Sequence, residues 1–145
     1  MISQTLINPD AYRIVGCAFE VHRHPGPGLP ESVYQSCFLK ELTGAGLTAF
    51  SQVYVPVIYK GSNLGGLFKL DILVNNLILV EVKATEGILP LYKAQLLSYL
   101  KLAGKLKGLL INFNCVSITK EGLVPLVKEE FAKLSKQILS VAPWP

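Results

Sequence analysis

Two short apolar runs joined by an Asn-Asn pair constrain the fold of this chain more than any other feature. Residues 66–74 and 77–83 are rich in aliphatic and β-branched side chains, which predicts two neighbouring strands connected by a turn. Three charged residues interrupt these runs: Asp71, Glu81 and Lys83. Because a buried charge is costly unless it is paired or binds a metal, these side chains need a chemical explanation.

The register of this strand pair follows from its apolar positions. Matching the apolar faces of the two strands requires Val74 to pair with Ile78, which places Asp71 opposite Glu81. A tight two-residue loop would instead pair Val74 with Leu77 and turn the two acids to opposite faces. We therefore expect a loop of odd length or a bulge between the strands.

Side-chain alternation also predicts which residues of each strand share a face. In the first strand, one face is expected to be wholly apolar, formed by Phe68, Leu70, Ile72 and Val74. In the second strand, the apolar face is formed by Ile78, Val80 and Val82. The opposite face of the hairpin then gathers the three charged residues at one end.

Two carboxylates held about 4–6 Å apart repel each other by a few kcal/mol, and removal from water adds to the cost. A divalent cation offsets more of this cost than a lysine can. Carboxylate oxygens of Asp71 and Glu81, with the main-chain carbonyl of Val82, would suit Mg²⁺ or Mn²⁺. Lys83 could then orient a water nucleophile or stabilise charge on a phosphate. The residues alone leave open a solvated sheet face with a Glu81–Lys83 ion pair.

Helical periodicity, glycines and prolines place the remaining elements. We predict helices that begin at residues 8–10 and at Pro30, a strand over 47–59 with an edge or bulge at Pro56, a helix over 90–103 closed by Gly104, a strand over 106–113 and a final amphipathic helix over about 124–140. This order predicts a single α/β domain over residues 1–145, with a mixed central sheet flanked by helices.

Five further candidate site residues lie on the predicted helices, and each has a structural alternative. Gln95 and Tyr99 share a helix face and could contact a phosphate or a base, or they could be a polar rim residue and a half-buried tyrosine. Glu31 could point at the same cation or complement the helix dipole. Tyr34 and His22 could contact substrate, with His22 as a general base, or they could be packing residues.

The composition excludes several classes of protein. Half of the 145 residues are hydrophobic, but the apolar runs, of about eight residues, are too short to span a bilayer. The three cysteines are far apart and form no C-x-x-C pair, which argues against a zinc ribbon or a four-cysteine cluster. Reduced thiols and the lack of a secretion-signal pattern lead us to expect a cytoplasmic protein. The net charge of +4 permits a nucleic-acid partner without requiring one.

Taken together, these segments resemble the GxxExxY family, a bacterial and archaeal group within the PD-(D/E)XK nuclease superfamily. The family signatures appear here as AFEVHRHPGPG, GLPESVY with Gly28, Glu31 and Tyr34, FKLDILV, LILVEVKA, AQLLSYL and GLLINFN. The resemblance spans about residues 8–114, outside which lies the predicted C-terminal helix. Lys69 and Tyr92 stand where family members commonly have arginine and histidine.

The resemblance implies a restriction-endonuclease-like α-β-β-β-α-β core and a metal-dependent phosphodiesterase site. Asp71 and Glu81 would be metal ligands, Lys83 the catalytic lysine and Glu31 the acidic residue of the early helix. Gln95 and Tyr99 would lie on the substrate side. We therefore expect a Mg²⁺- or Mn²⁺-dependent nuclease, with DNA favoured over RNA as substrate. The alternative is a non-catalytic module that binds nucleic acid or another protein, and a homodimer is possible in either case.

Overall fold

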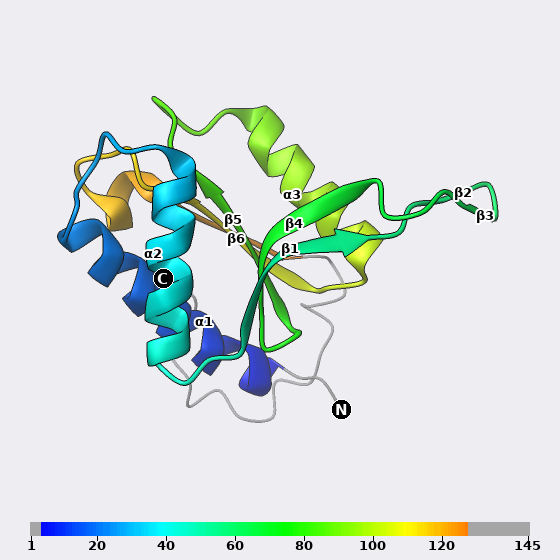
Figure 1. Ribbon diagram of the computed structural model, residues 1–145, viewed down its shortest axis with the longest axis horizontal. Coiled ribbons are helices and arrows are strands. Elements are labelled where there is room, and N and C mark those ends of the chain that lie inside the picture. The colour runs from blue at the N-terminus through cyan, green and yellow to red at the C-terminus, as the bar shows by residue number, and fades with distance from the viewer. Residues whose placement is uncertain (1–3, 128–145) are drawn as a thin grey trace.

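A central mixed sheet with helices on both faces organises the computed structural model, which describes residues 4–127 (Figure 1). Its elements are α1 (Gln4–Arg23), α2 (Glu31–Gly44), β1 (Ala49–Val55), β2 (Ile58–Tyr59), β3 (Ser62–Asn63), β4 (Phe68–Val74), β5 (Ile78–Lys83), α3 (Pro90–Ala103), β6 (Lys107–Asn112), a π-helical turn η1 (Ile118–Gly122) and β7 (Leu123–Val127). Within this range no helix is both long and apolar enough to cross a bilayer.

The main sheet has the strand order β1-β4-β5-β6-β7. Its one parallel pair is β5 with β6, and α3 forms the crossover between them. The other neighbouring strands are antiparallel. The predicted α/β architecture with a mixed sheet and flanking helices is confirmed.

The sheet separates two apolar cores. The larger core lies under α1 and α2 and includes Ile14, Phe38, Val80, Ile111 and Phe113. The smaller core lies under α3 and includes Val55, Leu70, Leu79, Leu96 and Leu110. Neighbouring residues of β5 therefore alternate between the two cores, as expected for a strand buried on both faces.

The predicted register of the β4–β5 hairpin is confirmed. Val74 pairs with Ile78, so three residues form the loop. Asn75 and Asn76 have φ angles of 52° and 56°, a left-handed conformation that asparagine tolerates better than most residues. The Asn75 side chain accepts a hydrogen bond from the main-chain N–H of Thr48 and donates one to Asp10, which ties the loop to β1 and α1.

The prediction of one wholly apolar face on β4 is wrong. Ile72 and Val74 pack in the larger core, but Phe68 and Leu70 pack in the smaller core, on the opposite side of the sheet. On the partner strand β1, Ala49 and Val55 divide between the cores in the same way. The strands turn over together where a left-handed Gln52 (φ 54°) lies across from Asp71 and the ladder pairing is interrupted. This break removes Asp71 from the regular β1–β4 ladder.

Three predicted element boundaries also need correction. Helix α1 already includes Gln4, and Pro9 lies inside it, in its second turn, where it removes one backbone hydrogen bond without ending the helix. The strand predicted over 47–59 ends at Val55, before Pro56, and its remainder includes β2, which pairs with β3 in a separate ribbon. Residues 123–127 form β7, not the start of a helix, because β6 offers an unpaired edge and edge strands tolerate Pro125. The rest of the helix predicted over 124–140 lies outside the described residues.

Candidate active site

Asp71 and Glu81 meet where β4 and β5 separate. The last main-chain pair of the hairpin in this direction is Ile72 with Val80. Beyond it, the N–H of Val82 donates to Asp71 Oδ2 over 2.9 Å, and the N–H of Asp71 donates to Glu81 Oε1 over 3.3 Å. The two carboxylates therefore replace backbone ladder bonds, and the strand pair brings them together on one side, as the register required.

Burial and mutual repulsion control the charge of this pair. The Glu81 residue is 6% exposed. Burial, the negative charge of Asp71 and a hydrogen bond between the two carboxyl groups raise the pKa of Glu81 to about 9, against the opposing effects of the Asp71 backbone N–H and Lys83. Without a cation the pair thus retains a proton at neutral pH. A divalent cation in the same place would remove the need for that proton.

Lys83 ends β5, two residues beyond Glu81 and therefore on the same side of the strand. Its Nζ lies 4.7 Å from the centroid of the Tyr92 ring, which comes from the first turn of α3. A cation over the face of an aromatic ring is attracted by the ring quadrupole. This contact directs the ammonium group toward the space between β5 and α3.

Glu31, the first residue of α2, supplies a third carboxylate to the neighbourhood. Burial and, to a lesser degree, the charge of Asp71 raise the pKa of Glu31, while Lys83 opposes the shift. Both charges reach Glu31 through space, so the start of α2 lies within electrostatic range of the β4–β5 pair. The structure thus brings Glu31 of α2 within electrostatic range of Asp71 and Lys83 on the β4–β5 hairpin, although α2 is distant from this hairpin in sequence.

One side of α3 carries the predicted substrate residues. Burial, then the charges of Glu81 and Asp71, raise the pKa of Tyr99, which places its hydroxyl in the field of the carboxylate pair. The Tyr99 ring stacks on Phe68 of β4 with a centroid distance of 4.9 Å. Gln95 is half-buried one turn earlier, between Tyr92 and Tyr99 along the helix. These side chains border the charged group.

Tyr34 and His22 have positions that indicate a structural role. Tyr34 is fully buried and its ring stacks on Phe113, so it offers no surface to a substrate. Its hydroxyl donates to the carbonyl of Gly26 and accepts from the N–H of Leu29, which holds the loop before Glu31. His22 donates from Nε2 to the Cys115 carbonyl over 2.7 Å.

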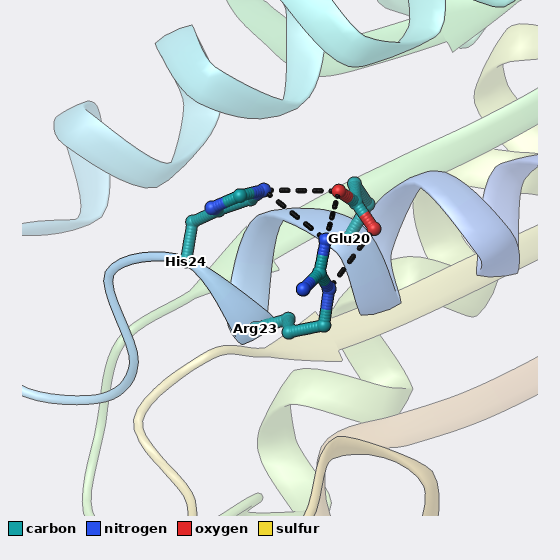
Figure 2. Close-up of polar contacts among 3 residues, drawn as sticks. All are labelled: Glu20, Arg23 and His24. Atoms are coloured by element: carbon teal, nitrogen blue, oxygen red, sulfur yellow. Dashed lines mark hydrogen bonds and ion pairs between the residues drawn. The ribbon is translucent and has the colours of Figure 1, made fainter.

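Glu20, an acidic residue near the end of α1, forms an exposed cluster with its neighbours. Figure 2 shows its carboxylate between Arg23 and His24. Arg23 donates to both oxygens, over 2.7 and 3.2 Å, and His24 Nε2 lies 2.9 Å from one of them. The hydrogen bond from Arg23 lowers the pKa of Glu20. These contacts connect side chains near the end of α1 and do not involve the carboxylate pair.

Sequence reasoning missed a buried amide that connects the two loops beside the site. Asn112, at the end of β6, is 2% exposed. Its Oδ1 accepts from the N–H groups of Thr85 and Asn114, and its Nδ2 donates to the Thr85 carbonyl. Asn114 in turn accepts from the N–H of Gly28 over 3.2 Å. One feature of the sequence could have indicated this role: Asn112 is a polar residue at the end of an apolar strand. That strand, β6, runs parallel to β5, which carries Lys83.

We expect Asn112→Ala to lower the free energy of unfolding by about 2 kcal/mol, because it leaves main-chain groups of Thr85 and Asn114 without this partner. Urea denaturation measures the change. Asn63→Ala is the matched control, since the Asn63 amide accepts from Gly65 in an exposed turn, and about 0.5 kcal/mol or less is expected there. Equal losses at the two positions would contradict a special role for Asn112.

The donor atoms suit a hard divalent cation. Within residues 4–127, no three His, Cys, Asp or Glu side chains form a ready-made metal-binding group. The candidate metal ligands are therefore the carboxylates of Asp71 and Glu81 and one main-chain carbonyl. The carbonyl of Val82 remains our prediction for this third ligand. The adjacent carboxylates of the buried Glu81 and the half-buried Asp71 fit an oxygen-only site for Mg²⁺ or Mn²⁺, with water completing the coordination.

Comparison with known proteins gives one match. The family model of the PD-(D/E)XK nuclease superfamily matches residues 8–124, a range that includes all the candidate site residues. No curated protein and no solved structure matches the chain. The match covers most of the sequence, and the mixed sheet with its paired carboxylates agrees with it. The chain therefore belongs to the PD-(D/E)XK nuclease superfamily.

Proposed function

We propose that this protein is a Mg²⁺- or Mn²⁺-dependent nuclease that hydrolyses phosphodiester bonds of nucleic acid, with DNA as its substrate. The observation that carries the proposal is the pair of carboxylates of the half-buried Asp71 and the buried Glu81, each of which accepts a hydrogen bond from a backbone N–H at the point where β4 and β5 separate. A protein gains no stability from such a pair. It is retained where a cation and a reaction need it.

The carboxylates of Asp71 and Glu81 would hold the cation, together with the Val82 carbonyl. The cation would stabilise the negative charge that develops on the phosphate during attack. Glu31 would contribute from outside the direct ligands, since burial and then the charge of Asp71 raise its pKa.

Lys83 would act on the nucleophile and the phosphate. Its ammonium group, held over Tyr92, can donate hydrogen bonds to the attacking water and to a phosphate oxygen. The new bond joins the water oxygen to phosphorus and the water gives up a proton to solvent. The bond from phosphorus to the leaving sugar oxygen breaks, and that oxygen takes up a proton from solvent. Tyr99, whose hydroxyl lies in the field of Glu81 and Asp71, and Gln95, one turn earlier on α3, would position the phosphate or an adjacent base.

We also propose a closer grouping with the GxxExxY family. In this grouping, Glu31 is the site residue, whereas Gly28 and Tyr34 shape the loop that leads into it. The spacing of the motif then has a physical reason. The hydroxyl of Tyr34 holds the loop before α2 through hydrogen bonds, and Glu31 follows this loop at the start of the helix.

The test is a cleavage assay with single- and double-stranded DNA and RNA, in Mg²⁺, in Mn²⁺ and in EDTA. We expect DNA cleavage in Mg²⁺ or Mn²⁺ and none in EDTA. Cleavage that survives both Asp71→Ala and Glu81→Ala would refute the proposed site. Binding that needs no metal and leads to no cleavage would instead support a non-catalytic module on this fold.

A further inference from the structure

A small ribbon projects from the sheet beside the candidate active site. The β2–β3 arm, residues 56–67, leaves the main sheet after β1 and returns at β4, and Figure 1 shows it extending away from the helices. Its two strands pair with each other in a sheet of their own. Main-chain hydrogen bonds between Val57 and both Leu64 and Gly65 continue the ribbon toward its base. The arm is therefore an ordered hairpin.

The arm and its base expose large apolar side chains to solvent. The exposed fractions of Tyr54 and Tyr59 are 66% and 58%. Further exposed side chains in the same region are Ile58, Leu64 and Leu67. A two-stranded ribbon is marginally stable alone, and an apolar surface on a projecting hairpin indicates a binding partner.

Two lysines make this surface cationic as well as aromatic. Lys60 Nζ lies 5.5 Å from the Tyr59 ring centroid, and Lys69 Nζ lies 5.9 Å from that of Tyr54. The sequence has no acidic residue between Glu41 and Asp71. The arm therefore carries net positive charge, and the stretch of chain that contains it has no carboxylate side chain. A complementary partner is an anion that also carries flat apolar groups.

The arm leads directly to the candidate site. Phe68, the first residue of β4 after the arm, stacks on Tyr99, whose hydroxyl lies in the field of Glu81 and Asp71. Lys69 is two residues before Asp71 on the same strand. A polymer that reached the carboxylate pair could continue along β4 onto the arm.

We propose that the β2–β3 arm binds an unpaired strand of nucleic acid that extends from the active site. Bases would stack on Tyr54 and Tyr59, while Lys60 and Lys69 contact phosphates. Bases in a duplex already stack on one another, so exposed tyrosine rings and aliphatic side chains favour unpaired bases. The identity of the polymer rests on the proposed nuclease function, but the arm concerns binding and not the chemical step.

Binding of a fluorescently labelled oligothymidine in EDTA, followed by fluorescence anisotropy, tests this proposal. We expect Tyr54→Ala and Tyr59→Ala each to weaken binding about 5- to 150-fold, from the usual contribution of one base stacked on an aromatic side chain. Tyr59→Phe, which keeps the ring, should bind nearly as well as the wild type. The matched control is Phe19→Ala, which removes an exposed aromatic ring on α1 and should change nothing.

The lysines are tested by the salt dependence of the same binding. The double variant Lys60→Gln/Lys69→Gln should reduce the slope of log affinity against log salt concentration by about 1.4, since each phosphate contact to a single strand contributes about 0.7. Lys120→Gln, an exposed lysine in η1, is the charge-matched control and should leave the slope unchanged.

Three results would overturn the proposal. Unchanged oligothymidine affinity in both tyrosine variants would show that bases do not stack on Tyr54 and Tyr59. Equal weakening toward a hairpin duplex would exclude a preference for unpaired strands. A wild-type dimer that becomes monomeric in Tyr59→Ala would identify the arm as a contact between copies. If the variants lose binding but the wild type cleaves nothing with any metal, the arm proposal stands and the proposed nuclease function fails.

Discussion

Asp71→Asn is expected to lower metal-dependent cleavage by at least about 100-fold. Residues that only support a metal ligand commonly contribute 10- to 100-fold to affinity or activity, so a direct ligand should contribute no less. The variant keeps the size of the side chain and an oxygen that can accept the Val82 N–H. It removes the negative charge that a cation needs. Initial cleavage rates, together with calorimetric titration of Mn²⁺, measure both effects.

The control for this variant is Glu86→Gln. Glu86 is exposed in the loop between β5 and α3, close in sequence to Lys83, and the substitution makes the same change of charge. It should leave cleavage and Mn²⁺ affinity within about twofold of the wild type. If the Asp71→Asn variant cleaves as fast as the wild type, the carboxylate pair has no role in the mechanism.

Glu81→Gln is expected to stabilise the metal-free protein while it destroys cleavage. Burial and Asp71 raise the pKa of Glu81 to about 9, from an ordinary value of 4.5. For an acid whose folded-state pKa is raised, stability is fully present below pH 4.5 and is lost as the pH rises toward 9. At about pH 8 in EDTA, the variant should therefore have a free energy of unfolding on the order of 3 kcal/mol greater than the wild type.

Urea denaturation at two pH values checks this prediction. Near pH 4.5, the unfolded-state pKa of Glu81, most of the advantage of Glu81→Gln should disappear, because the wild-type side chain there is largely protonated as well. Saturating Mg²⁺ should reduce the advantage at pH 8, since a cation that binds only the folded state stabilises the wild type. Glu86→Gln again serves as control. A variant less stable than the wild type in EDTA at pH 8 would contradict the repulsion argument.

Much of the candidate site could be predicted from local sequence pattern. The pairing of Val74 with Ile78 followed from matching apolar faces, and it placed Asp71 beside Glu81, where the structure shows each carboxylate accepting a hydrogen bond from a main-chain N–H of the opposite strand. Helix α3 begins at Pro90 and ends before a left-handed Gly104, as its sequence indicated. In both cases neighbouring residues alone set the backbone conformation.

Contacts between distant segments decided the rest. Tyr34 could be read as a substrate residue until its ring was seen stacked on Phe113, a residue far away in sequence. Residues 123–127 fit the period of a helix, but the free edge of β6 makes them a strand. Asn112 gained its role only because β6 lies parallel to β5 and brings its end next to Thr85.

The sequence by itself determined the strand pair, its register and the shared side of its two acids, because side-chain alternation and apolar matching act over a few residues. Only the tertiary structure decided that β1 and β4 turn over at Gln52 and Asp71, that α2 brings Glu31 to the pair and that the β2–β3 arm leaves the sheet. These features depend on which segments of the chain pack against one another. The free energy of such contacts belongs to pairs of residues far apart in the chain and has no local period.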